Sequence, residues 1–302
     1  MSLHETAPVL ELPARRRATR ATLVALRPRQ WTKNLLLFAG IVFAAKLGDA
    51  WRWADALAAF AGYCAASSAA YLVNDVRDAP FDRAHPVKRS RPVARGELSE
   101  RAAFALAAML VAAALVAIAP LGLVSIAFLV GFLALQGAYT LGLKHVVLID
   151  VMTISGLFVV RAAAGAAAVH VRISPWLLLC TALLALFLAL AKRRGELVPV
   201  GAEATPGRPV LEGYSLALVD QLVAIVAACT VISYSLYTFT ARDSKAMMVT
   251  IPFVVFGVFR YLLLVHRQDL GEEPEEVLLR DVPILVCMAA WAATAATILV
   301  VT

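Results

Sequence analysis

The chain has 302 residues, of which 61% are hydrophobic and 16% are charged, and its mean hydropathy is +0.79. Soluble domains hold about 45–50% apolar and about 25% charged residues, so this composition excludes a water-soluble globular protein and indicates a polytopic membrane protein. The net charge of +7 does not indicate a nucleic-acid partner, because no soluble basic domain accompanies it. Cys64, Cys180, Cys229 and Cys287 lie inside apolar runs, which excludes a disulfide framework.

The apolar runs predict an all-α membrane bundle of about nine transmembrane helices. A basic N-terminal segment over 1–33 precedes a single transmembrane domain over 34–302, and its polar first thirty residues lead us to expect no cleavable signal peptide. A span needs about 20 apolar residues. The runs that satisfy this requirement lie at 34–50, 54–73, 102–119, 121–139, 146–168, 175–191, 217–239, 246–265 and 283–301.

The distribution of basic residues predicts the orientation. If the N-terminus is cytoplasmic, every Lys and Arg falls in a cytoplasmic segment except Lys46, Arg52, Arg161, Arg172, Arg242 and Lys245. Basic residues collect on the cytoplasmic side of membrane proteins. We therefore expect a multi-pass protein of the cell inner (plasma) membrane, with the N-terminus and the active site in the cytoplasm and the C-terminus outside.

Three aspartates follow the second predicted span. Asp75, Asp78 and Asp82 stand at positions i, i+3 and i+7 of the loop, a spacing that places their carboxylates on one face if the segment is helical. Like charges so close repel one another unless a cation lies among them. Mg²⁺ prefers oxygen ligands and completes its shell with substrate phosphates, so we expect a magnesium site here.

A proline-interrupted basic segment comes next, with Lys88, Arg89, Arg91 and Arg95 within eight residues. Acids with a metal on one side and cations on the other can bind a diphosphate, because guanidinium groups bind phosphate oxygens in pairs. The alternative is an ordinary basic cytoplasmic loop. That alternative does not explain three acids at helical spacing.

Three further segments carry candidate residues. Arg29, Lys33 and Asn34 precede the first span and are either an interface anchor or phosphate ligands. After the fourth span, Tyr139 and Lys144 precede Asp150 at the entrance of the fifth, and an acid at such a position indicates a functional site. Lys192, Arg193 and Glu196 follow the sixth span, as a second phosphate-binding patch or a stop-transfer signal. Arg161, deeper in the fifth span, faces either a polar cavity or an acid.

Residues 74–82 resemble the first Asp-rich motif, Asn-Asp-x-x-Asp-x-x-x-Asp, of the UbiA-type intramembrane prenyltransferase superfamily. RPRQWTKN at 27–34, YLVNDVRD at 71–78, DRAHPVKRSRP at 82–92, GLKH at 142–145, RAAAG at 161–165, KRRGEL at 192–197 and GEEPEEVLLRD at 271–281 resemble its phosphoribosyltransferase branch. The resemblance runs over nearly the whole chain, in order.

The resemblance implies an activity and a site. The expected reaction joins phosphoribosyl pyrophosphate to decaprenyl phosphate and releases pyrophosphate, in the biosynthesis of the lipid-linked arabinose donor for cell-wall arabinogalactan. Asn74, Asp75, Asp78 and Asp82 would hold Mg²⁺, and the three aspartates are the catalytic candidates. The substrate-binding candidates are Arg29, Lys33, Asn34, Tyr71, Asn74, Arg83, Lys88, Arg89, Arg91, Tyr139, Lys144, Asp150, Lys192, Arg193 and Glu196.

Two other functions compete with this one. An aromatic prenyltransferase of a quinone or haem pathway would use a prenyl diphosphate. The resemblance implies that such members of the superfamily carry a second Asp-x-x-x-Asp motif on the fifth span. Here Ile154 stands four residues after Asp150, so the second acid of that motif is missing, which disfavours this function. A transporter is disfavoured because the polar clusters gather at one face of the membrane. The lipid bilayer is an expected partner, and we expect a homo-oligomer, a trimer.

Overall fold

The computed structural model describes residues 14–44, 46, 48–85, 87–198, 209–240, 244–267, 277 and 280–301, and the regular structure within these ranges is helical. The long helices are α3 (Ala50–Ala84), α4 (Glu100–Ile118), α5 (Leu123–Leu141), α6 (Ile149–Ala168), α7 (Pro175–Leu197), α8 (Leu216–Thr240), α9 (Ile251–Arg267) and α11 (Val282–Val301). The shorter elements are α1 (Ala14–Ala25), η1 (Pro28–Phe38), α2 (Ala39–Phe43), η2 (Lys88–Ser90), η3 (Ala119–Leu121), η4 (Leu143–His145), η5 (Pro209–Gly213) and η6 (Ala246–Thr250).

Eight helices of the described residues are long and apolar enough to cross a membrane. They match the last eight predicted spans, so the all-α bundle is confirmed. The first predicted span, 34–50, differs: the chain there forms the 3₁₀ helix η1 followed by the five-residue helix α2. A 3₁₀ helix rises about 2.0 Å per residue against 1.5 Å for an α-helix, so η1 and α2 together extend over about 30 Å, close to the thickness of a bilayer core.

Small residues let this extended segment approach α6. A Cβ built on Gly165 would lie 2.1 Å from the carbonyl oxygen of Leu37, and a Cβ on Gly40 would lie 2.7 Å from Cα of Ala166. Neither position admits a side chain while the backbones stay where they are. The close contact therefore depends on glycine at both positions and fixes η1 and α2 in the interior of the bundle.

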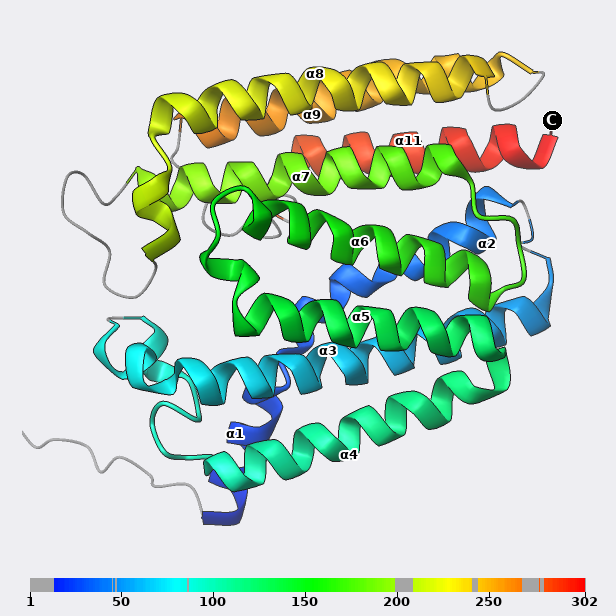
Figure 1. Ribbon diagram of the computed structural model, residues 1–302. Helices are drawn as coiled ribbons and strands as arrows, with labels where there is room; N and C mark the ends of the chain where they lie inside the picture. Colours follow the sequence, from blue (N-terminus) through cyan, green and yellow to red (C-terminus); the bar gives the residue numbers. More distant parts are fainter. Residues whose placement is uncertain are drawn as a thin grey trace, which may run out of the picture.

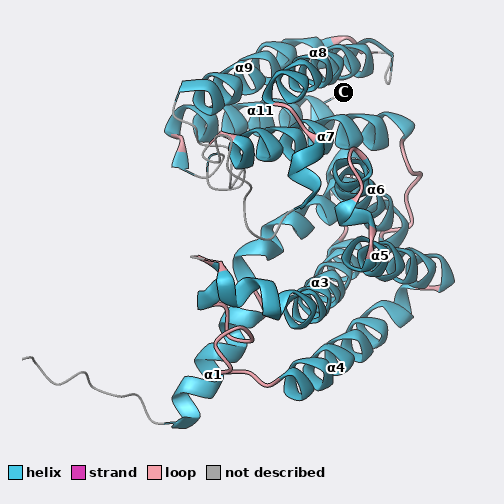
Figure 2. Cartoon of the chain, turned by 60° about the vertical axis from the view of Figure 1, so that its left-hand side comes forward, coloured by secondary structure: helices cyan, strands magenta, loops and turns pink. Residues whose placement is uncertain are grey.

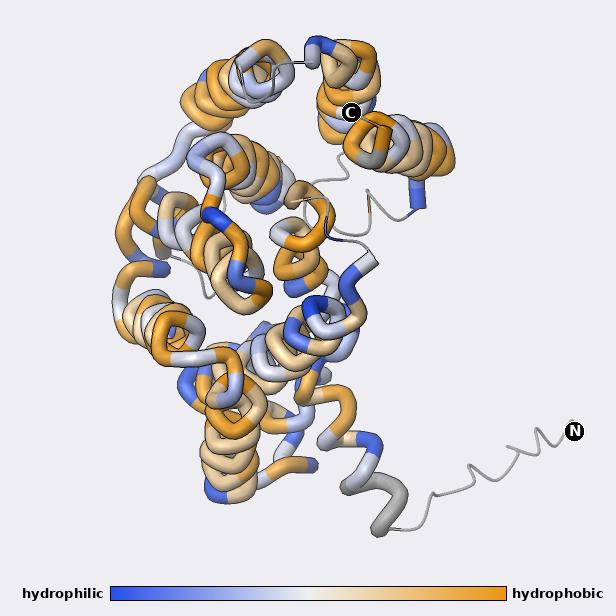
Figure 3. The backbone as a smooth tube through the Cα atoms, turned by 90° about the vertical axis from the view of Figure 1, so that its right-hand side faces the viewer, coloured by the Kyte–Doolittle hydropathy of each residue, from blue (hydrophilic) through white to orange (hydrophobic). Residues whose placement is uncertain are grey.

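The helices run back and forth along one direction (Figure 1). α3, α5 and α7 end where α4, α6 and α8 begin, at the left of Figure 1; we call this the motif end, because α3 carries the Asp-rich motif there. The C-terminus lies at the opposite end. Figure 2 shows α7, α8, α9 and α11 on one side of the bundle and α3, α4 and α5 on the other, with α6 between them. Hydrophobic residues cover the helices over most of their length (Figure 3).

Candidate active site

The Asp-rich motif lies on a helix rather than in a loop. α3 continues without interruption to Ala84, two residues beyond Asp82, although our second predicted span ended at residue 73. The helical spacing expected for the three acids is therefore observed on the last turns of α3. Asp75 and Asp82 are buried, with 1% and 4% exposure, and Asp78 is half-buried.

Arginines from two flanking segments pair with the buried acids. Arg91 Nη1 donates to Asp82 Oδ2 at 2.7 Å and to Asp75 Oδ1 at 3.2 Å, so one guanidinium bridges two carboxylates of the motif. Arg27 Nη2 donates to the same Asp75 oxygen. The basic segment after α3 and the segment before η1 thus meet at Asp75.

Lys144 of η4 completes the cluster. Its Nζ donates to Asp78 Oδ1 at 2.7 Å and to Asn74 Oδ1 at 3.2 Å, while Asn74 Nδ2 donates to Asp78 Oδ2 at 2.8 Å. Each acid of the motif therefore contacts a cation. We call Asn74, Asp75, Asp78 and Asp82 with Arg27, Arg91 and Lys144 the motif cluster.

The donor set of the motif cluster fits the chemistry of Mg²⁺. Its acids and Asn74 offer oxygen atoms only, which are the ligands that Mg²⁺ prefers. Within the described residues, however, no three His, Cys, Asp or Glu side chains are grouped so that they could hold a metal ion. Arg91 stands between Asp75 and Asp82 instead. The carboxylates could share an ion only together with a movement of this guanidinium.

Arg27 is a residue of the cluster that sequence reasoning missed. Its backbone is left-handed, with φ 51° and ψ 59°, a conformation that costs a residue other than glycine about 1–3 kcal/mol. Its guanidinium lies 4.9 Å from the ring centroid of Tyr71. Ser68 donates to the carbonyl of the neighbouring Leu26 at 2.8 Å and holds the turn against α3. The stretch RPRQWTKN contained the signal, but of its arginines we took Arg29, and not Arg27, as a candidate phosphate ligand.

Three other candidates precede the first span. Arg29 is exposed, and Lys33 is half-buried. Asn34 is fully buried, and its Oδ1 accepts a hydrogen bond from Arg161 Nε at 2.8 Å. Asn34 thus lies inside the bundle and has polar partners on two helices, Arg161 on α6 and Ser67 on α3.

The basic segment after α3 is partly committed to the fold. Arg83 Nε donates to the carbonyl of Ala94 at 3.3 Å, which folds the segment back onto α3. Arg95 pairs with the exposed Glu97 at 3.1 Å. Lys88 is half-buried and Arg89 exposed, and both lie in η2. The segment therefore presents cations at the motif end beside those that already contact the acids.

A second polar cluster forms where α6 begins. Asp150 is fully buried; its Oδ2 accepts from Arg193 Nε at 2.8 Å, and its Oδ1 accepts from the hydroxyl of Tyr214 at 2.6 Å. Arg193 Nη1 also donates to Glu196. The backbone N–H of Leu148 donates to the Tyr214 hydroxyl at 2.7 Å. We call Asp150, Arg193, Glu196 and Tyr214 the buried ion cluster.

The buried ion cluster contains more acid than base, so Arg193 does not offer an uncompensated charge to a phosphate. Tyr139 lies close enough to act on Arg193 electrostatically, and Lys192 is half-buried beside it. Tyr214, which we did not include among the candidates, joins η5 to the start of α6. Burial, and next the hydrogen bond to Asp150, raise the pKa of Tyr214, so its hydroxyl stays protonated at neutral pH.

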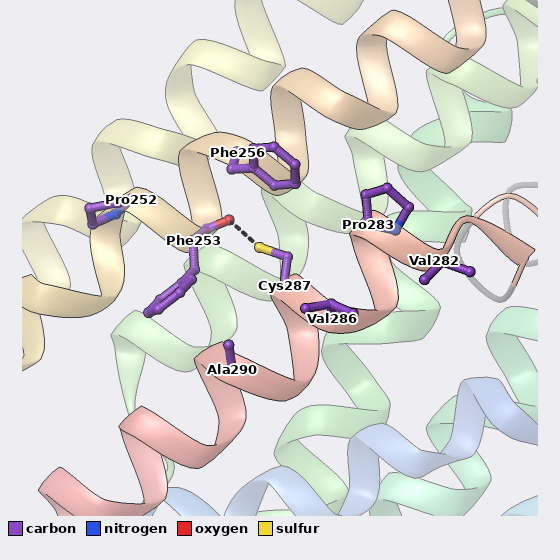
Figure 4. A pocket seen from close by; sticks show the side chains of 8 residues that line it. All are labelled: Pro252, Phe253, Phe256, Val282, Pro283, Val286, Cys287 and Ala290. Carbon is purple, nitrogen blue, oxygen red and sulfur yellow. Dashed lines mark hydrogen bonds between the residues drawn. The ribbon is translucent and has the colours of Figure 1, made fainter.

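An apolar pocket of about 550 Å³ lies between α9 and α11. Figure 4 shows its lining, in which the Cys287 thiol donates to the carbonyl of Phe253 at 3.1 Å. The lining side chains are Pro252, Phe253, Phe256, Val282, Pro283, Val286, Cys287 and Ala290. Because none of them is charged, this pocket is not a diphosphate site.

Comparisons with known proteins agree with the fold. The model of the UbiA prenyltransferase family matches residues 35–280. The chain is 36% identical to a decaprenyl-phosphate phosphoribosyltransferase of Mycolicibacterium smegmatis, over 89% of both chains. It is 34% identical to the protein of the same name from Corynebacterium glutamicum, over 88% of this chain and 83% of the relative.

A solved structure shares the arrangement of the helices. A UbiA homologue from Archaeoglobus fulgidus, bound to GPP and Mg²⁺, superposes with a TM-score of 0.72 at 17% identity, covering 93% of this chain and 100% of the other. At this identity the likeness concerns the fold. The family match over most of the chain, together with the curated relatives, shows that the chain belongs to the UbiA prenyltransferase family.

Proposed function

We propose that this chain transfers the 5-phosphoribosyl group of phosphoribosyl pyrophosphate to a polyprenyl phosphate, decaprenyl phosphate by the names of its relatives, and releases pyrophosphate. The observation that carries the proposal is the similarity of 34–36% over nearly the full length to proteins named for this reaction. Their names imply a lipid product, which agrees with a site at the end of a membrane bundle and with a role in cell-wall biosynthesis.

The motif cluster is the proposed site of the pyrophosphate leaving group. The charges of its three acids and three cations cancel. The donor, phosphoribosyl pyrophosphate, brings about five negative charges. Mg²⁺ would supply the added positive charge and stabilise the departing pyrophosphate, held by Asp75, Asp78, Asp82 and Asn74. Solved relatives that contain Mg²⁺ support a divalent ion.

The chain's own residues would orient the donor and stabilise developing charge. The lipid phosphate oxygen forms a bond to the anomeric carbon of the ribose while the bond from that carbon to the pyrophosphate oxygen breaks. The electron pair leaves with pyrophosphate, and no proton has to be removed, because the phosphate nucleophile is already ionised at neutral pH. Arg27, Arg91 and Lys144 line the acids at the proposed site, and Lys88 and Arg89 add positive charge nearby. Fixed charges of this kind lower the barrier without a general base.

We also propose that the motif end faces the cytoplasm, where a water-soluble, phosphorylated donor is available. The basic segments gathered at this end support the orientation through the positive-inside rule. The trimer remains a prediction.

The identity of the donor substrate distinguishes this function from that of an aromatic prenyltransferase. Purified enzyme is given polyprenyl phosphate with ribose-labelled phosphoribosyl pyrophosphate, or an aromatic acceptor with labelled prenyl diphosphate. We expect label in the organic phase from the first mixture, as a phosphoribosylated lipid. Transfer from prenyl diphosphate to the aromatic acceptor, with none from phosphoribosyl pyrophosphate, would assign the chain to the other activity.

A further inference from the structure

Arg161 of α6 is a buried cation without an acidic partner among the described residues. It has 4% exposure and lies about 16 Å along the helix from Asp150. Its Nε donates to Asn34 Oδ1 at 2.8 Å, and its Nη1 donates to the carbonyl of Leu157 at 3.1 Å. No described residue accepts a hydrogen bond from Nη2.

The other buried arginines of the described chain have their charge compensated by an acid, although Arg193 Nη2 has no hydrogen-bond partner. Arg193 pairs with Asp150 and Glu196, and Arg194 Nε donates to Asp220 Oδ1 at 2.8 Å. Around Arg161 the charge meets aromatic rings instead, with the guanidinium carbon 4.6 Å from the ring centroid of Phe132. A charge inside a membrane bundle is costly without an opposite charge or full hydrogen bonding, and such a residue indicates a functional site.

Tyr63 is a second buried residue near Arg161 with a donor that lacks a hydrogen-bond partner. Its ring packs against that of Phe132, with centroids 5.1 Å apart, and its hydroxyl is fully buried without a hydrogen-bond partner. Tyr63 and Tyr71 are close enough to Arg161 to interact with it electrostatically. Two neighbouring donors, Arg161 Nη2 and the Tyr63 hydroxyl, thus lack acceptors in the described structure, which is the arrangement that an anion would complete.

Tyr71 connects this place with the motif cluster. The Tyr71 ring lies under Arg27, and Arg27 binds Asp75. Tyr71 also precedes Asn74 by almost one turn of α3. The donors of Arg161 and Tyr63 therefore lie deeper in the bundle than the acids of the motif cluster. Tyr71 and Arg27 connect the two places.

We propose that Arg161 and Tyr63 form a second anion subsite, which takes a phosphate monoester group of one of the two substrates. The subsite rests on the proposed function for its ligands. Two sources offer this chemistry: the 5-phosphate of phosphoribosyl pyrophosphate and the phosphate of the polyprenyl acceptor. Asn34 holds the guanidinium of Arg161 in place and is a positioning residue.

Steady-state kinetics with each substrate varied in turn tests the subsite. Arg161→Gln raises the KM of one substrate by about tenfold or more, Arg161→Lys raises it less, and Tyr63→Phe raises the same KM by about two- to fivefold. Arg172→Gln, which changes an exposed arginine after α6, leaves both KM values within about twofold. A raised KM for phosphoribosyl pyrophosphate identifies the donor's 5-phosphate as the ligand, and a raised KM for the lipid identifies the acceptor's phosphate.

Unchanged KM values in both Arg161→Lys and Tyr63→Phe overturn the subsite, even if Arg161→Gln fails to fold, since the first two changes are conservative. Absence of transfer from phosphoribosyl pyrophosphate by the wild-type enzyme overturns the proposed function instead. In that case the subsite is tested separately from the function. The measurement is the thermal shift that polyprenyl phosphate or phosphoribosyl pyrophosphate produces in wild type and in Arg161→Lys. Equal shifts in the two proteins overturn it, and a smaller shift in Arg161→Lys supports it.

Discussion

Lys144 Nζ lies 2.7 Å from Asp78 Oδ1, although 66 residues separate them in the chain. The contact joins the connection between α5 and α6 to the last turns of α3, with only 15% of the Lys144 side chain exposed. A lysine that topology alone would place in a basic loop is thus held against an acid of the motif.

Replacement of Lys144 by glutamine should lower the transfer rate by about tenfold or more. A hydrogen bond to a charged group contributes about 1.5–3 kcal/mol, and the change also removes a positive charge beside the proposed pyrophosphate site. Initial rates of label transfer into lipid measure the effect, and Lys144→Arg should keep part of the activity. Lys245→Gln, at an exposed lysine of the opposite end, serves as control; equal rates in Lys144→Gln and Lys245→Gln would remove Lys144 from the site.

The transfer activity should depend more on Arg91, which bridges two acids, than on Arg95 of the same segment. Arg91→Ala leaves the buried Asp75 and Asp82 without their shared partner and should raise the donor's KM or lower kcat by about tenfold or more, because a buried charge that loses its partner is strongly disfavoured. Arg95→Ala breaks only an exposed pair with Glu97, which is worth about 0–1 kcal/mol. If the two variants were equally active, the bridge would have no part in the reaction.

Gly165→Ala should lower the melting temperature of the detergent-solubilised protein by several degrees. A Cβ at this position meets the Leu37 carbonyl oxygen at 2.1 Å, so η1 has to move away from α6. Gly137→Ala is the matched control on α5, where a Cβ meets nothing within 4 Å; there alanine should be neutral or stabilise the helix by up to about 1 kcal/mol. The contact of η1 with α6 would lose its importance if both variants melted at the same temperature.

Tyr214 and Asp150 should be energetically coupled. Tyr214→Phe removes a hydroxyl that donates to Asp150 and accepts from the backbone of Leu148, and we expect a loss of about 1–3 kcal/mol in the free energy of unfolding. A double-mutant cycle with Asp150→Asn should give a coupling energy of about 0.5–3 kcal/mol. Additive effects would mean that the contact contributes nothing.

The same tyrosine predicts a dependence on alkaline pH. The pKa of Tyr214 in the folded protein is raised above its ordinary value of 10.0. The folded state therefore retains this proton where the unfolded state loses it, so the stabilisation is complete below about pH 10 and decreases as the pH rises further. The stability difference between wild type and Tyr214→Phe should be constant near neutral pH and shrink above about pH 10. A difference that grew with alkaline pH would contradict the assigned hydrogen bond.

Much of this architecture was predictable from sequence, because span length and composition are local properties. The eight long helices follow from apolar runs, and the positions of Asp75, Asp78 and Asp82 on one helix follow from their spacing. The first span was not predictable in its detail: its 3₁₀ form depends on the approach of η1 to Gly165, which lies more than a hundred residues further along the chain.

The partners of the site residues were also beyond local reasoning. Arg27 reaches Asp75 across 48 residues of sequence, and Tyr214 reaches Asp150 across 64. Such pairs arise from the packing of helices, which composition does not encode. The sequence therefore indicated which residues are unusual for a membrane protein, whereas the structure shows which cation neutralises which acid.

The most direct test of the account measures the transfer of ribose label from phosphoribosyl pyrophosphate to polyprenyl phosphate. It compares wild type with Asp75→Asn and Asp78→Asn, each with Mg²⁺ or with EDTA. Glu100→Gln, at an exposed acid of the same end, is the matched control. We predict lipid-bound label from wild type and Glu100→Gln with Mg²⁺, and none with EDTA or from either aspartate variant, although both variants still insert and purify as folded protein. Full activity of both aspartate variants, or wild-type transfer unaffected by EDTA, would contradict the proposal that these carboxylates bind a divalent ion with the leaving pyrophosphate.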